Sequence, residues 1–320
     1  MTKMRTYLAV CIITALSMIL CPLAATGKGG DNEAVTVTES VADEKDDVIS
    51  VMLSQSGKSS EIEMREYIIG CVAAEMPADY HSEALKAQAV ASYTYAKRIR
   101  ESNTDKAADI TDNPAVHQGY IDKAERKEKW GEKFDEYEEK IGAAVDSVLG
   151  EYMSFDGETV LAVYHSNSAG RTRNAENLWG SEISYLVSVE SGGDRLSPDY
   201  IRAVTFSEDE LLRYIEKCGV TPKGSADEWI EEIKRDDEGY VTSITVCGEE
   251  VSATDFRSAA KLESACFEIE YDGEFTVTCK GYGHGVGLSQ YGADYMARQG
   301  FSYREILSHY YTGVSLESEE

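Results

Sequence analysis

EYIIGCVAAEMPADYHSEALKAQAVASYTY, residues 66–95, predicts two helices that meet at a corner. Apolar residues recur at helical spacing over 65–76, and Pro77 ends that segment because its ring cannot continue a helix. Ser82 then begins a second helix as its N-cap, and a basic run closes that helix near Arg100. This corner is the strongest fold signal in the chain.

Glu75 stands at the end of the apolar face of the first helix. Ile68, Cys71 and Val72 lie seven, four and three residues before it, so the four side chains share one stripe. Burial and the negative end of the helix dipole both disfavour the carboxylate, so we expect a raised pKa. A glutamate shifted in this way can act as a general acid near neutral pH. The alternative is a structural role, with Glu75 bonded to backbone N–H groups of residues 78–80.

The N-terminal segment differs in character from the rest of the chain. Lys3 and Arg5 precede an apolar run at 7–25, which predicts a membrane anchor, or a secretory signal if it is cleaved; we favour the anchor. Residues 27–47 include seven acids, and the few large apolar side chains there predict a flexible tether. The expected divisions are an anchor or signal (1–26), a tether (27–47), a folded domain outside the cytoplasm (48–316) and an acidic tail (317–320).

Composition bounds the partners of this protein. The 320 residues are 42% hydrophobic, which is enough for a core in one large or two smaller domains. The net charge of −27 argues against nucleic acids and anionic lipid surfaces, since both need a basic face. Neutral glycans, cationic partners and small molecules remain.

Two cysteines in the C-terminal half are spaced for a disulfide. Cys266 and Cys279 stand six residues on either side of Asp272-Gly273, which is a signal for a two-residue hairpin turn. In that register the cysteines oppose each other at a non-hydrogen-bonded pair, where a disulfide can form. A packed pair of free thiols is the alternative.

The remaining pattern predicts an α+β fold. We expect strands at 48–54, 152–155, 159–165, 184–190, 241–246, 251–252, 267–271 and 275–279, and further helices at 123–149, 207–217, 226–234 and 303–310. Helices cluster at the ends of the domain rather than alternating with strands. The helical corner should therefore pack with mixed, mostly antiparallel strands, in one or two lobes.

The segment GYGHGVGLSQYG, residues 281–292, repeats glycine at alternate positions. The missing side chains let another backbone or a flat ligand approach closely. The segment lacks the Lys-Ser/Thr ending of a phosphate-binding loop. His284, Ser289 and Gln290 could recognise hydroxyl and amide groups. The alternative is a tight strand–loop junction whose polar groups bond to backbone.

The segment YHSNSAGR, residues 164–171, places His165, Ser166 and Ser168 at the end of a predicted strand. No cysteine or second histidine stands nearby, so the local pattern does not predict zinc. No serine in the chain has the Gly-x-Ser-x-Gly elbow, so a serine nucleophile stays a minor alternative that rests on partners distant in sequence.

Three long motifs resemble, in order, the stage II sporulation protein D family, known also from amidase-enhancer proteins. They are residues 66–96, residues 163–194, and residues 256–273 followed by 281–316. With HQGY at 117–120, the resemblance covers about residues 48–316. It implies a membrane-anchored lytic transglycosylase that acts on peptidoglycan during forespore engulfment in endospore formation. It also implies a cell-wall amidase and an anchoring membrane protein as partners.

The resemblance assigns the catalytic role to the glutamate of the family's EMP motif, which is Glu75 here. One acid is enough, because the C6 hydroxyl of N-acetylmuramic acid is the nucleophile and leaves a 1,6-anhydro end. A non-catalytic, glycan-binding enhancer of an amidase is the alternative. A hydrolase would need a second carboxylate, and neither Asp79 nor Glu83 is given that role.

Motif position makes eight further residues candidates for contact with the glycan: Gln88, Tyr93, His165, Ser166, Ser168, His284, Ser289 and Gln290. Tyr93 stands where the family usually has arginine, which puts the glycan contact of that arginine in doubt. Some members hold zinc with a histidine and cysteines around this histidine segment. Residues 166–169 offer no thiol, so we predict no metal and no other cofactor.

Overall fold

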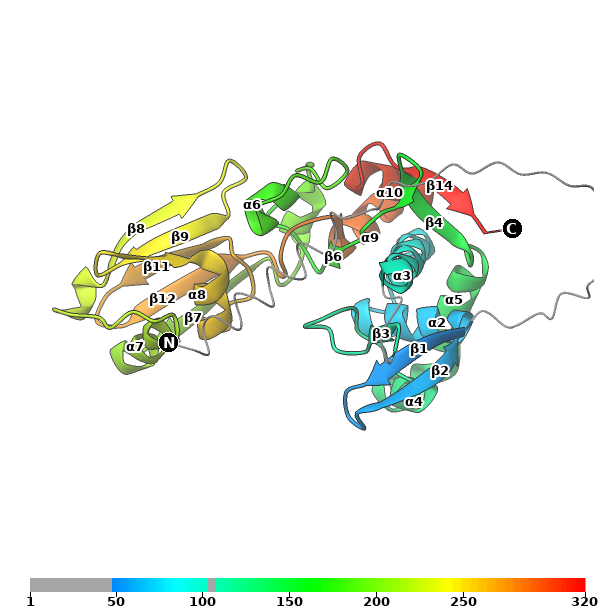
Figure 1. Cartoon of the computed structure of the whole chain (residues 1–320), viewed down its shortest axis with the longest axis horizontal. Coiled ribbons are helices and arrows are strands. Elements are labelled where there is room, and N and C mark those ends of the chain that lie inside the picture. The colour runs from blue at the N-terminus through cyan, green and yellow to red at the C-terminus, as the bar shows by residue number, and fades with distance from the viewer. Residues whose placement is uncertain (1–47, 103–107, 320) are drawn as a thin grey trace, which may run out of the picture. The chain divides into compact units, whose positions relative to one another are not determined.

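Two large hydrophobic cores organise the residues described by the computed structural model, 48–102 and 108–319 (Figure 1). The predicted anchor and tether lie outside the described residues. Within the described ranges, no helix combines the length and the apolar character needed to cross a bilayer.

Helix α3 is the centre of the first core. The corner consists of α2 (Met64–Glu75) and α3 (Ser82–Ser102), and α3 also contacts α5 (Phe134–Asp146), α9 (Gln290–Arg298) and α10 (Tyr303–Tyr310). Small side chains recur on α3, so neighbouring helices can pack closely on several sides. The predicted corner is confirmed, with one change at the start of α3. Ser82 is the first helical residue, and Nδ1 of His81 accepts the N–H of Glu83 at 3.2 Å.

Short strands complete the first core. They are β1 (Val48–Leu53), β2 (Lys58–Glu63) and β3 (Ile110–Thr111) in one sheet; β4 (Glu151–Phe155), β5 (Glu158–Thr159) and β14 (Ser315–Ser318) in a second; and the pair β6 (Tyr164–His165) and β13 (Leu288–Ser289). β6 and β13 run parallel, so the histidine segment lies beside the end of the glycine-rich segment. The predicted acidic tail begins inside β14, where Glu317 pairs with Tyr152 of β4.

The second core is built from residues 201–280. Its elements are β7 (Ile201–Phe206), α7 (Glu208–Lys217), β8 (Ile230–Arg235), β9 (Val241–Val246), β10 (Glu249–Ser252), α8 (Ala253–Ala260), β11 (Phe267–Tyr271) and β12 (Phe275–Lys280). They form two antiparallel three-stranded sheets, ordered β10-β9-β8 and β11-β12-β7. Inside, the rings of Trp229 and Phe275 stack with centroids 5.8 Å apart. The α+β class with mostly antiparallel strands is confirmed.

The predicted helix at 226–234 is wrong. Only Ala226–Glu228 forms a helical turn, and β8 follows it. Ile230 and Ile233 have the three-residue spacing of a helix face, but an irregularity in the pairing with β9 lets both turn away from solvent in a strand. The sequence pattern could not separate these two cases.

The predicted helix at 123–149 is interrupted. Helix α4 (Lys123–Trp130) ends at Gly131, whose φ is +53°, and the single turn Gly131–Lys133 leads into α5. A positive φ breaks the helical path at little cost only when the residue is glycine. The stripe of apolar residues continues across the break because both helices face the same core.

The predicted strand at 184–190 is wrong. The predicted strand at 159–165 is interrupted, and only its two ends are strands, as parts of β5 and β6. Side chains rather than a neighbouring strand satisfy much of this backbone. Ser188 N–H donates to Asn174 Oδ1 at 2.8 Å, and Val189 N–H donates to Thr172 Oγ1 at 2.8 Å. Helix α6 (Ala175–Trp179) and the turn Gly192–Leu196 flank this irregular stretch.

Of the two alternatives for Cys266 and Cys279, the structure shows free thiols and no disulfide. Tyr271 pairs with Phe275, so three residues close the hairpin instead of two. The register places Cys279 opposite Phe267, one position away from Cys266. Successive side chains of a strand point to opposite faces, so the two thiols lie on opposite sides of the sheet.

Candidate active site

Glu75 is the last residue of α2, and its half-buried side chain is held by the backbone of a distant loop. The N–H of Gly119 donates to Glu75 Oε1 at 2.6 Å, so the hydrogen bond does not come from residues 78–80. Burial raises the pKa of Glu75, against the opposing effects of the Gly119 N–H and the positive charge of Lys129. The direction predicted from the sequence is confirmed. The carboxyl is therefore a better proton donor near neutral pH than an exposed glutamate.

Gln118 fixes the position of the Gly119 N–H. Its buried amide donates through Nε2 to Tyr67 Oη at 3.0 Å and to the Ser92 carbonyl at 3.2 Å. Its Oε1 accepts from Tyr164 Oη at 2.9 Å. Each hydrogen-bonding group of the amide is engaged, and such a satisfied network holds one geometry.

Two cavities meet at Glu75 and Tyr164. One, of about 200 Å³, is lined by those two residues with Tyr95, Pro114, His117, Gln118, Val163 and His284. The other, of about 300 Å³, is lined by them with Ala74, His165, Ser166, Tyr282, Gly283 and Gln290. Glu75 thus lines both cavities, so a ligand that occupied both would pass beside its carboxyl.

His165 and His284 line these cavities as neutral rings. Burial lowers the pKa of His165 to about 3 and that of His284 to about 4. Nδ1 of His165 lies 3.1 Å from the Val286 carbonyl, so it carries the proton and leaves a lone pair on Nε2. Nδ1 of His284 accepts the N–H of Val286 at 3.1 Å. Neither ring adds charge to the site at neutral pH.

Asp194 joins the histidine segment, residues 164–171, to the glycine-rich segment, residues 281–292. Its buried carboxylate accepts from Ser168 N–H at 2.8 Å, Ser168 Oγ at 2.5 Å and Ser289 Oγ at 2.7 Å. Ser289 also caps α9 by accepting the N–H of Gly292. Ser168 and Ser289 are therefore internal links rather than cavity surface.

The other residues predicted to contact the glycan also divide into those that line a cavity and those that do not. Ser166 and Gln290 line the larger cavity, as does His165. Gln88 is fully buried and accepts from Gln290 Nε2 at 3.3 Å, so it supports Gln290 from below. Tyr93 donates to Glu319 at 2.5 Å and is not among the residues that line either Glu75 cavity.

The alternating glycines are explained by close backbone packing. Gly281 and Gly283 have φ of +77° and +114°, and a Cβ added at Gly283 would lie 2.7 Å from the Cβ of His165. Between them, Tyr282 exchanges two backbone hydrogen bonds with Asn167, at 2.8 and 3.1 Å. The glycine-rich segment is thus a tight junction that also brings its polar residues to the cavities.

Sequence reasoning missed several members of the site. Gly119 and Gln118 belong to the HQGY motif, which is part of the family resemblance but was not among the predicted site residues. Tyr164 directly precedes His165, and Lys129 lies on a helix interpreted only as packing. A buried tyrosine and a backbone N–H have no distinctive spacing, so only the motif matches could have indicated them: HQGY for Gln118 and Gly119, and residues 163–194 for Tyr164. Over the described ranges, no group of three or more His, Cys, Asp or Glu side chains is arranged to hold a metal ion.

The fold and the site describe an α+β protein with two adjoining cavities that share one carboxyl, Glu75, whose pKa is raised by burial. A family model described as Stage II sporulation protein matches residues 54–155. Stage II sporulation protein D of Bacillus amyloliquefaciens is 36% identical over 307 residues, 93% of this chain and 88% of the relative. Its namesake in Bacillus subtilis (strain 168) is 37% identical over 277 residues, 85% of this chain and 79% of the relative.

The chain belongs to the stage II sporulation protein D family. A more distant relative, the amidase enhancer of Bacillus subtilis (strain 168), is 25% identical over 307 residues. That match covers 78% of this chain and 40% of the relative.

Proposed function

We propose that this protein is a peptidoglycan lytic transglycosylase and that Glu75 is its catalytic acid and base. The observation that carries the proposal is the cleft itself. Among the described residues that line the two cavities, Glu75 is the only carboxylate, and burial raises its pKa. A single-acid site supports a reaction with an internal nucleophile over hydrolysis by a carboxylate pair.

The reaction needs two proton transfers at one residue. Protonated Glu75 donates to the glycosidic oxygen after N-acetylmuramic acid, the bond from that oxygen to C1 breaks, and the next sugar leaves with a hydroxyl. The Glu75 carboxylate then takes the proton of the C6 hydroxyl, whose oxygen bonds to C1 and closes the 1,6-anhydro ring. Glu75 ends protonated again, so no water is consumed.

The contacts of Glu75 suit both steps. Gly119 N–H holds Oε1 at 2.6 Å, which leaves Oε2 for the sugar. The same N–H and the Lys129 charge lower the pKa of Glu75 against the effect of burial, so the carboxylate formed after proton donation is not prohibitively unstable. The group can therefore serve as acid and base in one cycle.

Membership of the family also supports a proposal for the cellular process, the location and the partners of this protein. We place the activity in endospore formation, at engulfment, with residues 7–25 as the membrane anchor and the folded domain outside the cytoplasm. A cell-wall amidase and a membrane anchoring protein are the proposed partners. The second candidate function is non-catalytic enhancement of the amidase, which the likeness to an amidase enhancer supports.

Digestion of amidase-stripped glycan strands tests the proposal, with mass spectrometry to detect 1,6-anhydromuramic ends. We expect these ends from the parent protein and a loss of about 100-fold or more for Glu75→Gln, which keeps the shape of the side chain without its proton. Unchanged cleavage by the variant would remove Glu75 from the mechanism. An absence of anhydro ends combined with stimulation of an amidase would establish the enhancer function instead.

A further inference from the structure

Two aromatic rings stay exposed beside the Glu75 cavities. Tyr282 lines the larger cavity with 49% of its surface exposed. Trp179 is 43% exposed, and its ring centroid lies 6.2 Å from that of His284, which lines the smaller cavity. Exposure alone is ordinary, since Tyr295 and Phe301 are exposed to a similar extent; what sets Tyr282 and Trp179 apart is their place beside the Glu75 cavities.

The backbone that carries Tyr282 is rigid. Its N–H and carbonyl both bond to Asn167, at 2.8 and 3.1 Å, and glycines of positive φ flank it on either side. The flanking glycine Gly281 packs so tightly that an added Cβ would meet the Asn167 carbonyl at 2.8 Å. The ring is therefore presented to solvent by a fixed frame, which lowers the entropy lost when a ligand binds.

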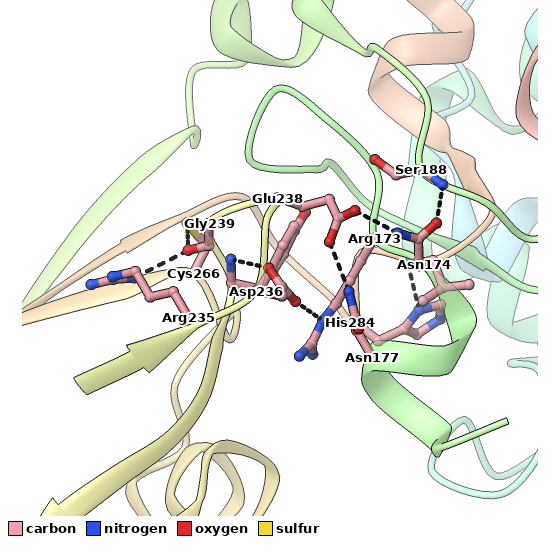
Figure 2. Close-up of polar contacts among 12 residues, drawn as sticks. Arg173, Asn174, Asn177, Ser188, Arg235, Asp236, Glu238, Gly239, Cys266 and His284 are labelled. Atoms are coloured by element: carbon pink, nitrogen blue, oxygen red, sulfur yellow. Dashed lines mark hydrogen bonds and ion pairs between the residues drawn. The ribbon is translucent and has the colours of Figure 1, made fainter. Parts of the chain in front are cut away.

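Helix α6, which ends with Trp179, is also fixed. Figure 2 shows Asn174 and Asn177 reaching Glu238, with Nδ2 to carboxylate oxygen distances of 2.5 and 2.9 Å. Immediately before α6, Arg173 pairs with Asp236 at 2.7 Å, and both side chains are buried. These bonds tie the start and the middle of α6 to the β8–β9 turn, two residues before the indole of Trp179.

We propose that Tyr282 and Trp179 are stacking platforms for sugar rings on either side of Glu75. The inference rests on the proposed function and adds which residues hold the glycan strand. One face of a pyranose ring is lined by C–H groups of partial positive charge, and an aromatic face is negative. The neutral rings of His165 and His284 add no charge to the cavity lining, so contact through the face of a sugar ring needs no ion pair there.

The positions of the two rings relative to the two cavities explain why the glycosidic bond to be broken would lie next to Glu75. The two cavities share only Glu75 and Tyr164, and one of the two exposed rings lies at each: Tyr282 lines the larger cavity, and Trp179 lies against His284 of the smaller one. A strand held by a stacked sugar on each side would present the connecting oxygen between the platforms. Because stacking does not depend on the chemistry of Glu75, binding and cleavage can be measured separately.

Binding of amidase-stripped glycan strands by the full chain, in the Glu75→Gln background, tests the inference. Tyr282→Ala and Trp179→Ala should each weaken binding by about 3- to 10-fold, which corresponds to about 0.6–1.4 kcal/mol per lost aromatic contact. Tyr282→Phe and Trp179→Phe keep an aromatic face and should bind within about twofold of the background protein. Phe301→Ala is the matched control, because Phe301 is 43% exposed and lines neither Glu75 cavity.

The outcomes separate the two proposals. Weakened binding by both alanine variants, restored by both phenylalanine variants, supports the platforms even if the parent protein produces no anhydro ends. Binding by both alanine variants equal to that of Phe301→Ala overturns the platforms, even if Glu75 proves catalytic. An equal loss in the alanine and phenylalanine variants also overturns stacking, since it would assign the effect to the hydroxyl and the indole N–H.

Discussion

A methyl group at Gly119 should displace the carboxyl of Glu75, the proposed catalytic group, while leaving the fold intact. In Gly119→Ala, the added Cβ would lie 2.9 Å from Glu75 Oε1 and 3.4 Å from the Cβ of Ala74. The first distance is about half an ångström short of ordinary van der Waals contact. Because Oε1 is the far end of a flexible side chain, the carboxyl moves rather than the backbone.

The displacement sets the size of the effect. A catalytic group has to be held within about 0.5 Å of its productive position, and a misplacement of about 1 Å can lower a rate about 100-fold. We expect glycan cleavage by Gly119→Ala to fall by about 10- to 100-fold. Loss of the 2.6 Å hydrogen bond from Gly119 also removes an effect that lowers the pKa of Glu75. The alkaline limb of the pH–rate profile should therefore move to higher pH.

The free energy of unfolding should change little, within about 1 kcal/mol, because alanine also restricts the unfolded chain. Urea denaturation measures this, and anhydro ends released per minute measure the rate. Gly142→Ala is the control: its Cβ would approach only Arg65 Nη2, at 3.6 Å, inside α5. The control should keep full activity. Full activity and an unchanged pH profile in Gly119→Ala would refute the claim that this contact positions Glu75.

Three further predictions concern charge and burial. Lys129→Met removes a positive charge that lowers the pKa of Glu75, so the alkaline limb of the pH–rate profile should move to higher pH. The free energy of unfolding of Glu75→Gln, measured relative to that of the parent, should increase as the pH rises from about 4 to 8. The reason is that a folded-state pKa above the unfolded value makes the native state of the parent lose stability as pH rises through it. Asp194→Ala should lower the free energy of unfolding by about 3 kcal/mol, because the hydroxyls of Ser168 and Ser289 lose a buried acceptor.

Each of these predictions has its own control and contrary outcome. Lys127→Met on the same helix should leave the pH profile in place, and an equal shift in both lysine variants would mean a general charge effect. A stability difference between Glu75→Gln and the parent that does not vary with pH, in urea denaturation, would contradict the raised pKa. Exposed Asp272→Ala should change stability by less than about 0.5 kcal/mol, and an equal effect of Asp194→Ala would contradict the proposed link.

Local patterns predicted those parts of the molecule that have a single local solution. The apolar stripe before Glu75 and the stop at Pro77 predicted the corner, because helix periodicity and proline geometry act within a few residues. The pattern failed at 226–234, where the pairing of β8 with β9 overrides a three-residue spacing. It failed again at Cys266, where one extra turn residue shifts the register and reverses the face.

The sequence by itself determined the helical corner, the α+β class and an acid of raised pKa at Glu75, since each follows from short-range spacing and burial. Only the tertiary structure decided what surrounds that acid. The Gly119 N–H that holds Glu75 lies 44 residues away, and Ser289 reaches Asp194 across 95 residues. Contacts across such separations depend on how the whole chain closes on itself, and no local pattern encodes them.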